Sequence, residues 1–271
     1  MGDPEATSRH PSERRFEEFF VEDNYVALKN YLYNYLERKR AINRLLDGNS
    51  ERILEVGSGQ SPIVTGRDNV IYSELSFRAL VTLKGLNQRG HYVVADCTQL
   101  PFASDAISEV ICSEVLEHVQ DDQAAISELA RVLKPGGQSY ITVPHRKFYF
   151  AADDRYVHHF RRYEIDEMTE KLNAAGFSLK SMKKVLGPLE KVTMFTLVML
   201  FSALQYFMNR NANQQGTTSS IGKLLRSAIR PVFKWAHRAY ALLARFDAWV
   251  MPRSLATVIL FEAVKEENSQ P

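Results

Sequence analysis

The sequence has 271 residues, of which 45% are hydrophobic, and its formal net charge is +2. This length and apolar content suffice for one α/β domain with a large core and an added segment. The near-neutral charge excludes a chain that attracts nucleic acid through its overall field. Two cysteines exclude a disulfide scaffold and a cysteine-rich zinc site. Since no cationic stretch with an apolar run opens the printed sequence, we expect no secretion signal and a cytoplasmic location.

The first part of the chain divides into a polar tail and a helix. Residues 1–20 are polar and charged, and we expect them to form a flexible tail. Asp23 is a suitable N-cap for a helix that runs to about Leu46, because apolar residues recur there at helical spacing. On this helix we expect a basic cluster to face solvent: Arg38, Lys39, Arg40 and Arg44.

The most informative stretch is 53–61, where a short apolar strand breaks into small residues. Gly57 and Gly59 leave no side chain between the backbone and a ligand above the turn, and Glu55 places a carboxylate before it. Such a turn, after the first strand of an α/β sheet, is where nucleotide-like ligands bind. Pro62 stands where a dinucleotide-binding turn needs a third glycine, which argues against NAD. An ordinary strand-to-helix turn is the alternative.

Two further strands are predicted to end in acids. Residues 69–74 predict a strand that ends at Glu74, whose carboxylate can accept hydrogen bonds from both hydroxyls of a ribose. Residues 91–96 predict a strand that ends at Asp96, which can accept from an exocyclic amino group such as that of adenine. A surface acid at a strand end is the alternative for Glu74.

The remaining core elements follow in a regular order. They are a strand over 106–112, a helix over 121–132, a turn at 134–137, a strand over 139–143, a helix over 164–175 that stops at Gly176, a strand over 177–186 and a last strand over 256–264.

Three blocks of sequence carry a family resemblance: Glu-x-Gly-x-Gly at 55–59, Ser-Glu-Val-Leu-Glu-His-Val at 113–119, and the run at 128–137. They resemble the motifs of class I S-adenosylmethionine-dependent methyltransferases of the type 11, small-molecule branch, over about residues 50–185. The resemblance implies a three-layer, doubly wound α/β sheet of seven strands in the order 3-2-1-4-5-7-6, with the last strand antiparallel. It also implies S-adenosyl-L-methionine as cofactor, bound by Glu55, Gly57, Ser58, Gly59, Glu74, Asp96, Cys97 and Ser113.

In that strand order the two cysteines, Cys97 and Cys112, follow strands that are three inter-strand steps apart. This separation exceeds what a disulfide spans, so we expect two free thiols that serve mainly in packing.

The loop after the fifth strand carries the candidate bases. Methyl transfer needs alignment and, for a hydroxyl acceptor, a base, a task that histidine suits near neutral pH. The candidates are His145, His158 and His159. The segment 158–163 also resembles a structural clasp of related methyltransferases, so a structural role is the alternative for each. We expect no metal site, because no cysteine or paired ligand spacing supports zinc.

Residues 187–253 form an insertion between the sixth and seventh strands. Residues 192–209 are uncharged but too short and too polar to span a membrane. Residues 221–250 predict a basic amphipathic helix with tryptophans, typical of a helix that lies on an anionic membrane. The alternative is a lid that docks its apolar face, with Leu243, Phe246 and Val250, on the preceding segment.

We therefore predict a tail at 1–20, a methyltransferase core at 21–186 completed by a strand at 254–266, and a helical insertion at 187–253. The predicted function is methyl transfer to a small, hydrophobic or lipid-linked acceptor, at oxygen, with no nucleic acid as partner. With 221–250 on lipid, the protein would lie peripherally on the inner face of a membrane. A non-catalytic protein that binds S-adenosylmethionine or serves as a membrane-surface scaffold is the alternative.

Overall fold

The computed structural model describes residues 32–196, 199 and 239–267. Within them, one seven-stranded sheet has the order β3-β2-β1-β4-β5-β7-β6, which confirms the predicted topology. Strands β1 to β5 all pair in parallel with their neighbours among these five, and β7 is antiparallel to both of its neighbours, β5 and β6. The strands are β1 (Ile53–Val56), β2 (Val70–Glu74), β3 (His91–Val94), β4 (Ile107–Ser113), β5 (Leu133–Pro144), β6 (Phe177–Leu186) and β7 (Val258–Lys265).

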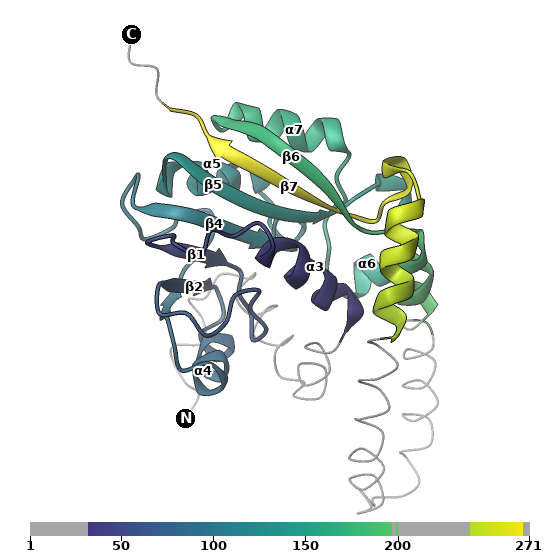
Figure 1. Ribbon diagram of the computed structural model, residues 1–271, viewed down its shortest axis with the longest axis horizontal. Coiled ribbons are helices and arrows are strands. Elements are labelled where there is room, and N and C mark those ends of the chain that lie inside the picture. The colour runs from purple at the N-terminus through teal and green to yellow at the C-terminus, as the bar shows by residue number, and fades with distance from the viewer. Residues whose placement is uncertain (1–31, 197–198, 200–238, 268–271) are drawn as a thin grey trace, which may run out of the picture.

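Helices cover both faces of the sheet and give the expected three layers (Figure 1). One face is covered by α5 (Asp122–Val132) and α7 (Ile165–Ala174), and the other by α3 (Tyr33–Asn43) and α4 (Phe77–Leu86). The short elements are α6 (Ala152–Tyr156) and the 3-10 turns η2 (Leu116–His118), η3 (Lys147–Tyr149) and η4 (Arg253–Leu255). Residues 188–196 and 239–250 are also helical.

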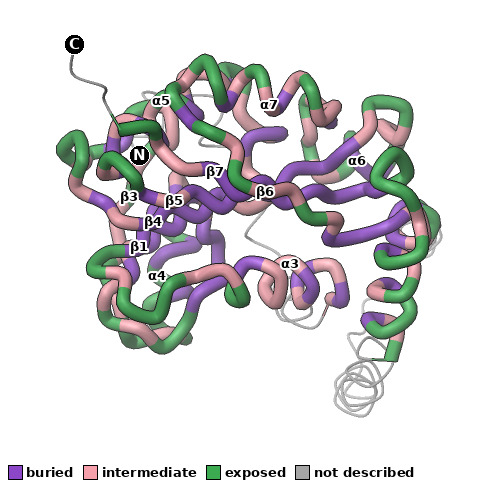
Figure 2. The backbone as a smooth tube through the Cα atoms, turned by 45° about the horizontal axis from the view of Figure 1, so that its top comes forward, coloured by how far each residue is buried: buried purple, intermediate pink, exposed green. Residues whose placement is uncertain are grey.

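Alternation along the strands divides the core into two clusters. In β1, Leu54 and Val56 pack on the side of α5 and α7, whereas Ile53 packs on the side of α3 and α4. In β4, Cys112 packs on the side of α5 and α7, and its neighbour Ile111 packs on the side of α3 and α4. Because side chains alternate between the faces of a strand, a slip of one residue would exchange the two cores. The central strands are therefore buried on both faces, as Figure 2 shows.

The helix predicted before β1 is shorter than expected within the described residues. It begins at Tyr33, because the backbone of Leu32 is extended (φ −65°, ψ 131°), and it ends at Asn43. The predicted N-cap, Asp23, lies outside the described residues.

The turn predicted before the fifth strand is a bulge inside β5. Ile107 of β4 pairs with Leu133. Glu109, two residues further along β4, pairs with Gln138, five residues further along β5. Gly136, with a φ of +73°, supplies the left-handed backbone that this bulge uses. The proline and glycines therefore distort a strand that was expected to start after them.

The described ends of the insertion, 188–196 and 239–250, lie side by side next to α3 and β6 (Figure 1). The N–H of Leu189 donates to Oδ2 of Asp247 at 3.0 Å, and the hydroxyls of Thr193 and Tyr240 are hydrogen-bonded. The predictions for 192–209 and for 221–250 fall mostly on residues outside those described. No helix of the described residues is long and apolar enough to cross a membrane.

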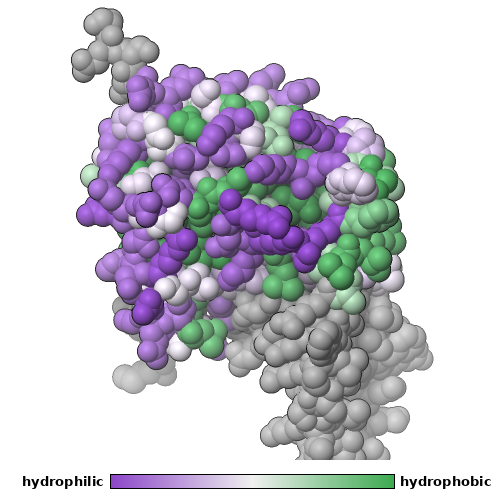
Figure 3. All heavy atoms as spheres, viewed as in Figure 1, coloured by the Kyte–Doolittle hydropathy of each residue, from purple (hydrophilic) through white to green (hydrophobic). Residues whose placement is uncertain are grey.

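Residues 239–250 present their small side chains to the core. The buried residues are Ala241, Ala244 and Ala248. The large apolar residues are exposed: Leu242, Leu243, Phe246, Trp249 and Val250. In this described part of the insertion, the residues that the lid alternative would bury are exposed, since alanines allow the helix to approach the sheet closely while the bulky residues remain outside. Figure 3 shows hydrophobic side chains gathered over this helix.

Candidate functional site

The glycine turn leaves β1 at the centre of the sheet and folds against the end of β2. The N–H groups of Gly57 and Ser58 both donate to the carbonyl of Ser73, at 2.8 and 3.2 Å. Gly57 and Gly59 have φ angles of +66° and +53°, which favour glycine. A Cβ atom on Gly57 would also overlap the side chain of Val115. Backbone conformation and close packing therefore both require glycine at position 57.

Glu55 holds the loop behind this turn. Its buried carboxylate accepts the N–H groups of Ile63, at 2.6 Å, and Val64, at 3.1 Å. Because each oxygen binds a backbone amide, we assign Glu55 to shaping the loop. Its contact with a cofactor stays a prediction.

Glu74 lies at the end of β2 directly against the glycine turn. Its Oε2 accepts the N–H of Gly59 at 2.9 Å, and its Oε1 accepts that of Ser76 at 3.1 Å. The structure thus brings Glu74 and Gly59 together, as a ribose site requires.

The other predicted cofactor residues occupy the carboxyl ends of their strands with different partners. Asp96 is exposed, and its Oδ1 accepts from the N–H and hydroxyl of Thr98 at 2.8 and 2.7 Å. The hydroxyl of Ser113 lies 2.8 Å from that of Thr142. The hydroxyl of Ser58 is buried and has no hydrogen-bond partner among the described residues, which leaves it available to a ligand.

Both cysteines are free thiols, as predicted. Burial, with the charge of Asp96, raises the pKa of Cys97 to about 12. Burial also raises the pKa of Cys112 well above its usual value. Because the thiolate is the nucleophilic form, neither residue suits nucleophilic catalysis.

α3 closes one side of this edge of the sheet. The hydroxyl of Tyr35 donates to the carbonyl of Pro62 at 2.6 Å, and Nζ of Lys39 donates to the same carbonyl at 3.2 Å. Arg38 forms an ion pair with Glu114, just beyond β4, at 2.9 Å. Burial lowers the pKa of Lys39. The prediction that Arg38 and Lys39 face solvent is therefore wrong, because α3 turns this side toward the glycine turn and the end of β4.

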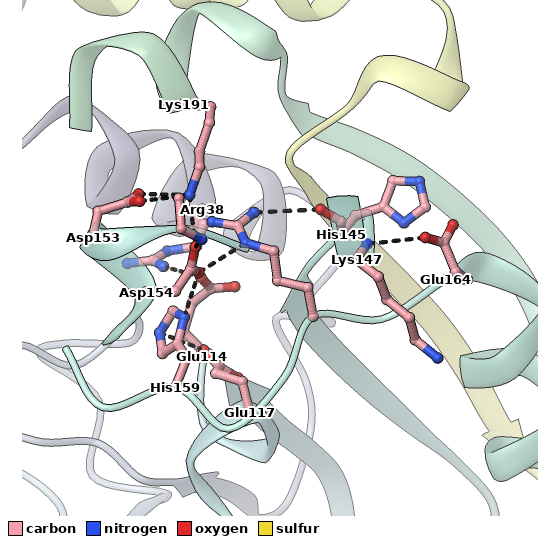
Figure 4. A network of polar contacts seen from close by, with 12 residues as sticks. Arg38, Glu114, Glu117, His145, Lys147, Asp153, Asp154, His159, Glu164 and Lys191 are labelled. Carbon is pink, nitrogen blue, oxygen red and sulfur yellow. Dashed lines mark hydrogen bonds and ion pairs between the residues drawn. The ribbon is translucent and has the colours of Figure 1, made fainter. Parts of the chain in front are cut away.

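A buried charged cluster lies beside the loops that follow β4 and β5 (Figure 4). At its centre, Oδ1 of Asp154 accepts from Nε of Arg162 at 2.8 Å, and Oδ2 lies 2.6 Å from Nζ of Lys191. Lys191 also contacts Asp153 at 2.7 Å. Burial alone would raise the pKa of Asp154, but hydrogen bonds from His159 and Lys191 and the charge of Arg162 hold it below its usual range. Through Lys191, the cluster ties the insertion to the site loops.

Of the three candidate bases, His145 has the environment that best suits a base. It is 2% exposed, and its Nδ1 lies 2.8 Å from the carbonyl oxygen of Tyr163. Since a carbonyl only accepts, Nδ1 carries the proton and Nε2 carries the lone pair. Nε2 is buried and has no hydrogen-bond partner in the part of the chain that the structure describes. Burial lowers the pKa of His145, which keeps the ring neutral.

The other two histidines differ from each other. His158 is exposed at a loop position with a φ of +63°. His159 lies inside the charged cluster, with Nδ1 2.9 Å from Oδ1 of Asp154 and Nε2 3.7 Å from Oε1 of Glu117. This position agrees with the structural alternative for His159, and the structure does not bring His158 into the cluster.

Sequence reasoning missed four members of the site: Arg38, Glu117, Asp154 and Lys191. The run from Glu114 through Glu117 to His118 after β4 was the available signal for Glu117. Lys191 has no local signal, because its carboxylate partners are 37 and 38 residues away in the sequence.

A groove of about 510 Å³ lies on a separate part of the surface, between α3, β6 and 239–250. The acid in its lining, Glu37, pairs with Arg245 at 2.8 Å. The basic residues that line it are Arg40, Arg44, Lys183, Lys184, Arg245 and Arg253. The excess of basic side chains in this lining favours the binding of anions.

Comparison with known proteins shows that the central segment is similar to methyltransferases. Residues 54–141 match the family model of a methyltransferase domain. Over 103 residues, a demethylmenaquinone methyltransferase of Mycolicibacterium paratuberculosis is 32% identical, a match that spans 37% of this chain and 45% of that protein. The matched segment contains the glycine turn, Glu74 and the run after β4, on which the predicted resemblance rested.

Solved structures show the same fold beyond this domain. Phosphoethanolamine N-methyltransferase 2 of Haemonchus contortus, in complex with S-adenosyl-L-methionine, has a TM-score of 0.51 at 18% identity and covers 84% of this chain and 52% of that one. The [4+2]-cyclase SpnF has a TM-score of 0.51 at 21% identity and covers 84% of this chain and 80% of that one. The chain spans less than half the length of the curated methyltransferase it matches, so the activity of the whole protein is inferred from its site.

Proposed function

We propose that the protein transfers a methyl group from S-adenosyl-L-methionine to a small, hydrophobic acceptor. The observation that carries this proposal is the glycine turn, with Glu74 held against it by the N–H of Gly59. The family match of residues 54–141 supports the same reaction class.

The residues at the turn fit this cofactor. Gly57 supplies the left-handed backbone of the turn, and the buried hydroxyl of Ser58 is available as a donor. The carboxylate of Glu74, positioned by the backbone amides of Gly59 and Ser76, is the type of acceptor that ribose hydroxyls require. Asp96 is exposed at the neighbouring strand end, where it can accept from the adenine amino group. The cofactor supplies an electrophilic methyl group on its sulfonium sulfur.

Oxygen is our proposal for the accepting atom, with His145 as the base that takes its proton. The lone pair on Nε2 of His145 is buried, and the ring is kept neutral. A neutral histidine at the end of β5 can accept a proton as the acceptor oxygen attacks. The remaining work of the protein is to align the two reactants and exclude water.

A hydrophobic, quinone-like or lipid-linked acceptor is supported by two observations. The relative from M. paratuberculosis is a demethylmenaquinone methyltransferase. The helix 239–250 exposes Phe246 and Trp249, which are 61% and 76% exposed, beside the basic groove. Bulky apolar side chains next to cationic ones are typical of a surface that rests on anionic lipid. We propose that this surface brings the protein to a membrane that holds its acceptor.

Calorimetric titration tests the cofactor assignment directly. The protein should bind S-adenosylhomocysteine with one site per chain and should not bind NADH. Binding of NADH, or of neither ligand, would overturn the proposal.

A further inference from the structure

Three possible metal ligands meet beside the end of β4, although the sequence predicts no metal site. Glu117 and His118 come from η2, and His159 comes from the loop after α6. One ligand atom from each residue lies within 4.8 Å of the others. The three residues are brought together by the fold alone, because His159 is far from the other two in sequence.

Glu117 is the observation that points to a cation. Its side chain is 0% exposed, and neither carboxylate oxygen has a hydrogen-bond partner among the described residues. The contact with Nε2 of His159, at 3.7 Å, is too long to be a hydrogen bond. A buried carboxylate without such partners is costly unless a positive charge compensates it.

His159 is oriented as a metal-bound histidine is. Its Nδ1 lies 2.9 Å from Oδ1 of Asp154, so this nitrogen carries the proton and Nε2 directs its lone pair toward Glu117. Metal-binding histidines commonly donate their other N–H to a carboxylate in this way. Asp154 is in turn fixed by Arg162. It is also fixed by Lys191, as Figure 4 shows.

The charges around Glu117 leave room for a cation. Four carboxylates form the surrounding ion-pair network, namely Glu114, Glu117, Asp153 and Asp154. Three permanent cations face them, namely Arg38, Arg162 and Lys191. With all four ionised, these carboxylates outnumber the three cations by one, so a bound cation would compensate the charge of Glu117.

We propose that Glu117, His118 and His159 bind a divalent transition-metal ion. Ligands at ~2.1 Å around a tetrahedral zinc ion stand ~3.4 Å apart, so the 3.7 Å between Glu117 and His159 needs only a small closure. Two imidazoles and a carboxylate suit zinc, manganese or iron better than magnesium, which prefers oxygen ligands. Three protein ligands leave a position open to water or substrate.

The segment that supplies two of the proposed ligands borders the glycine turn, because Val115, two residues before Glu117, packs against Gly57. If the proposed function is correct, on which this step rests, the open position takes an oxygen of the methyl acceptor and lowers its pKa. Metal binding itself does not depend on that step.

The test is titration of the metal-stripped, full-length protein with Zn²⁺ by calorimetry and with Co²⁺ by visible absorption. We expect one ion per chain and the absorption bands of Co²⁺ with nitrogen and oxygen ligands. Glu117→Gln and His159→Gln should each weaken binding at least ~10-fold, and Asp154→Asn should do so by ~10-fold or more through His159. His158→Asn is the matched control, since it is exposed and asparagine tolerates its positive φ.

Each arm has a result that overturns the proposal. No stoichiometric binding of either ion by the wild-type protein would exclude the site without reference to any variant. Equal affinity in the wild type, Glu117→Gln and His159→Gln would place a bound ion elsewhere. Because these titrations contain no cofactor, their failure is distinguishable from failure to bind S-adenosylhomocysteine.

Discussion

Glu74 and Glu117 are both buried acids close to the end of a central strand, yet their surroundings differ. Both oxygens of Glu74 accept backbone N–H groups from the turn and helix start beside it. Neither oxygen of Glu117 accepts a hydrogen bond from a described residue, and the cationic side chains near it, Arg38 and Arg162, come from distant parts of the chain. The first acid is stabilised by its own loop, whereas the second depends on a cluster that tertiary structure assembles. The comparison separates a site built from local sequence from one built by the fold.

The largest expected effect is a loss of stability when the buried charged cluster around Asp154 loses one of its cations. Lys191→Met removes a cation that contacts Asp153 and Asp154, and both carboxylates are buried. Uncompensated buried charge should lower the free energy of unfolding by about 3 kcal/mol, measured by urea denaturation. Lys180→Met is the control, because Lys180 is 54% exposed in its pair with Glu262 and should cost less than about 1 kcal/mol. Equal losses in the two variants would mean that the cluster adds nothing beyond a surface ion pair.

Removing the locally stabilised acid should affect ligand binding most. Glu74→Ala deletes the proposed acceptor of the ribose hydroxyls and should weaken S-adenosylhomocysteine binding ~30-fold, equivalent to about 2 kcal/mol. Asp68→Ala, at the exposed start of the same strand region, is the control and should bind as the wild type does. An unchanged dissociation constant for Glu74→Ala would remove Glu74 from the ribose site.

A third prediction extends the comparison to the surface that the insertion supplies. Replacing Phe246 and Trp249 together by serine should lower partitioning onto anionic vesicles ~10-fold, about 1.4 kcal/mol, because both side chains are exposed. Phe77→Ser is the control, since Phe77 is 66% exposed on α4. Sedimentation with vesicles measures the difference. If all three proteins sediment alike, the helix 239–250 is not the membrane-binding surface.

The smallest expected effect is on the free energy of unfolding, and it has opposite signs for substitutions of Glu117 and of Glu74. In the metal-free protein, burial and the charge of Glu114 raise the pKa of Glu117, so this acid costs stability at neutral pH, and Glu117→Gln should raise the free energy of unfolding by about 1 kcal/mol. Glu74→Gln replaces an acceptor of backbone N–H groups and should lower it by about 1 kcal/mol. Thermal unfolding of both variants at neutral pH gives the signs. A loss of stability in both would show that Glu117 is already satisfied within the protein.

Sequence predicted the parts of the fold that local patterns control. The strand end at Glu74, the helix over 121–132 and the stop at Gly176 all follow from apolar runs and their boundary residues. The strand order came from the family resemblance, and the topology confirms it. The glycine turn and its acid were within reach because their contacts span 15 residues.

The assembled cluster could not be predicted in the same way. Lys191 contacts Asp153 across 38 residues of sequence, and Arg245 meets Glu37 across 208. The orientation of Arg38 toward Glu114 depends on how α3 docks, which its charge pattern does not determine. The exposure of Trp249 likewise depends on tertiary packing, because the alanines of 239–250 are the residues that dock this helix on the core.

Methyl transfer itself is the most direct test of the account. The full-length protein is incubated with S-adenosyl-L-methionine labelled in its methyl group and with a lipid extract that contains quinones, and organic-soluble label is counted. The account predicts label in the organic phase that increases with time and falls strongly with Glu74→Ala. Tight binding of S-adenosylhomocysteine without any transfer to lipid or aqueous acceptors would contradict it and favour a non-catalytic, cofactor-binding scaffold.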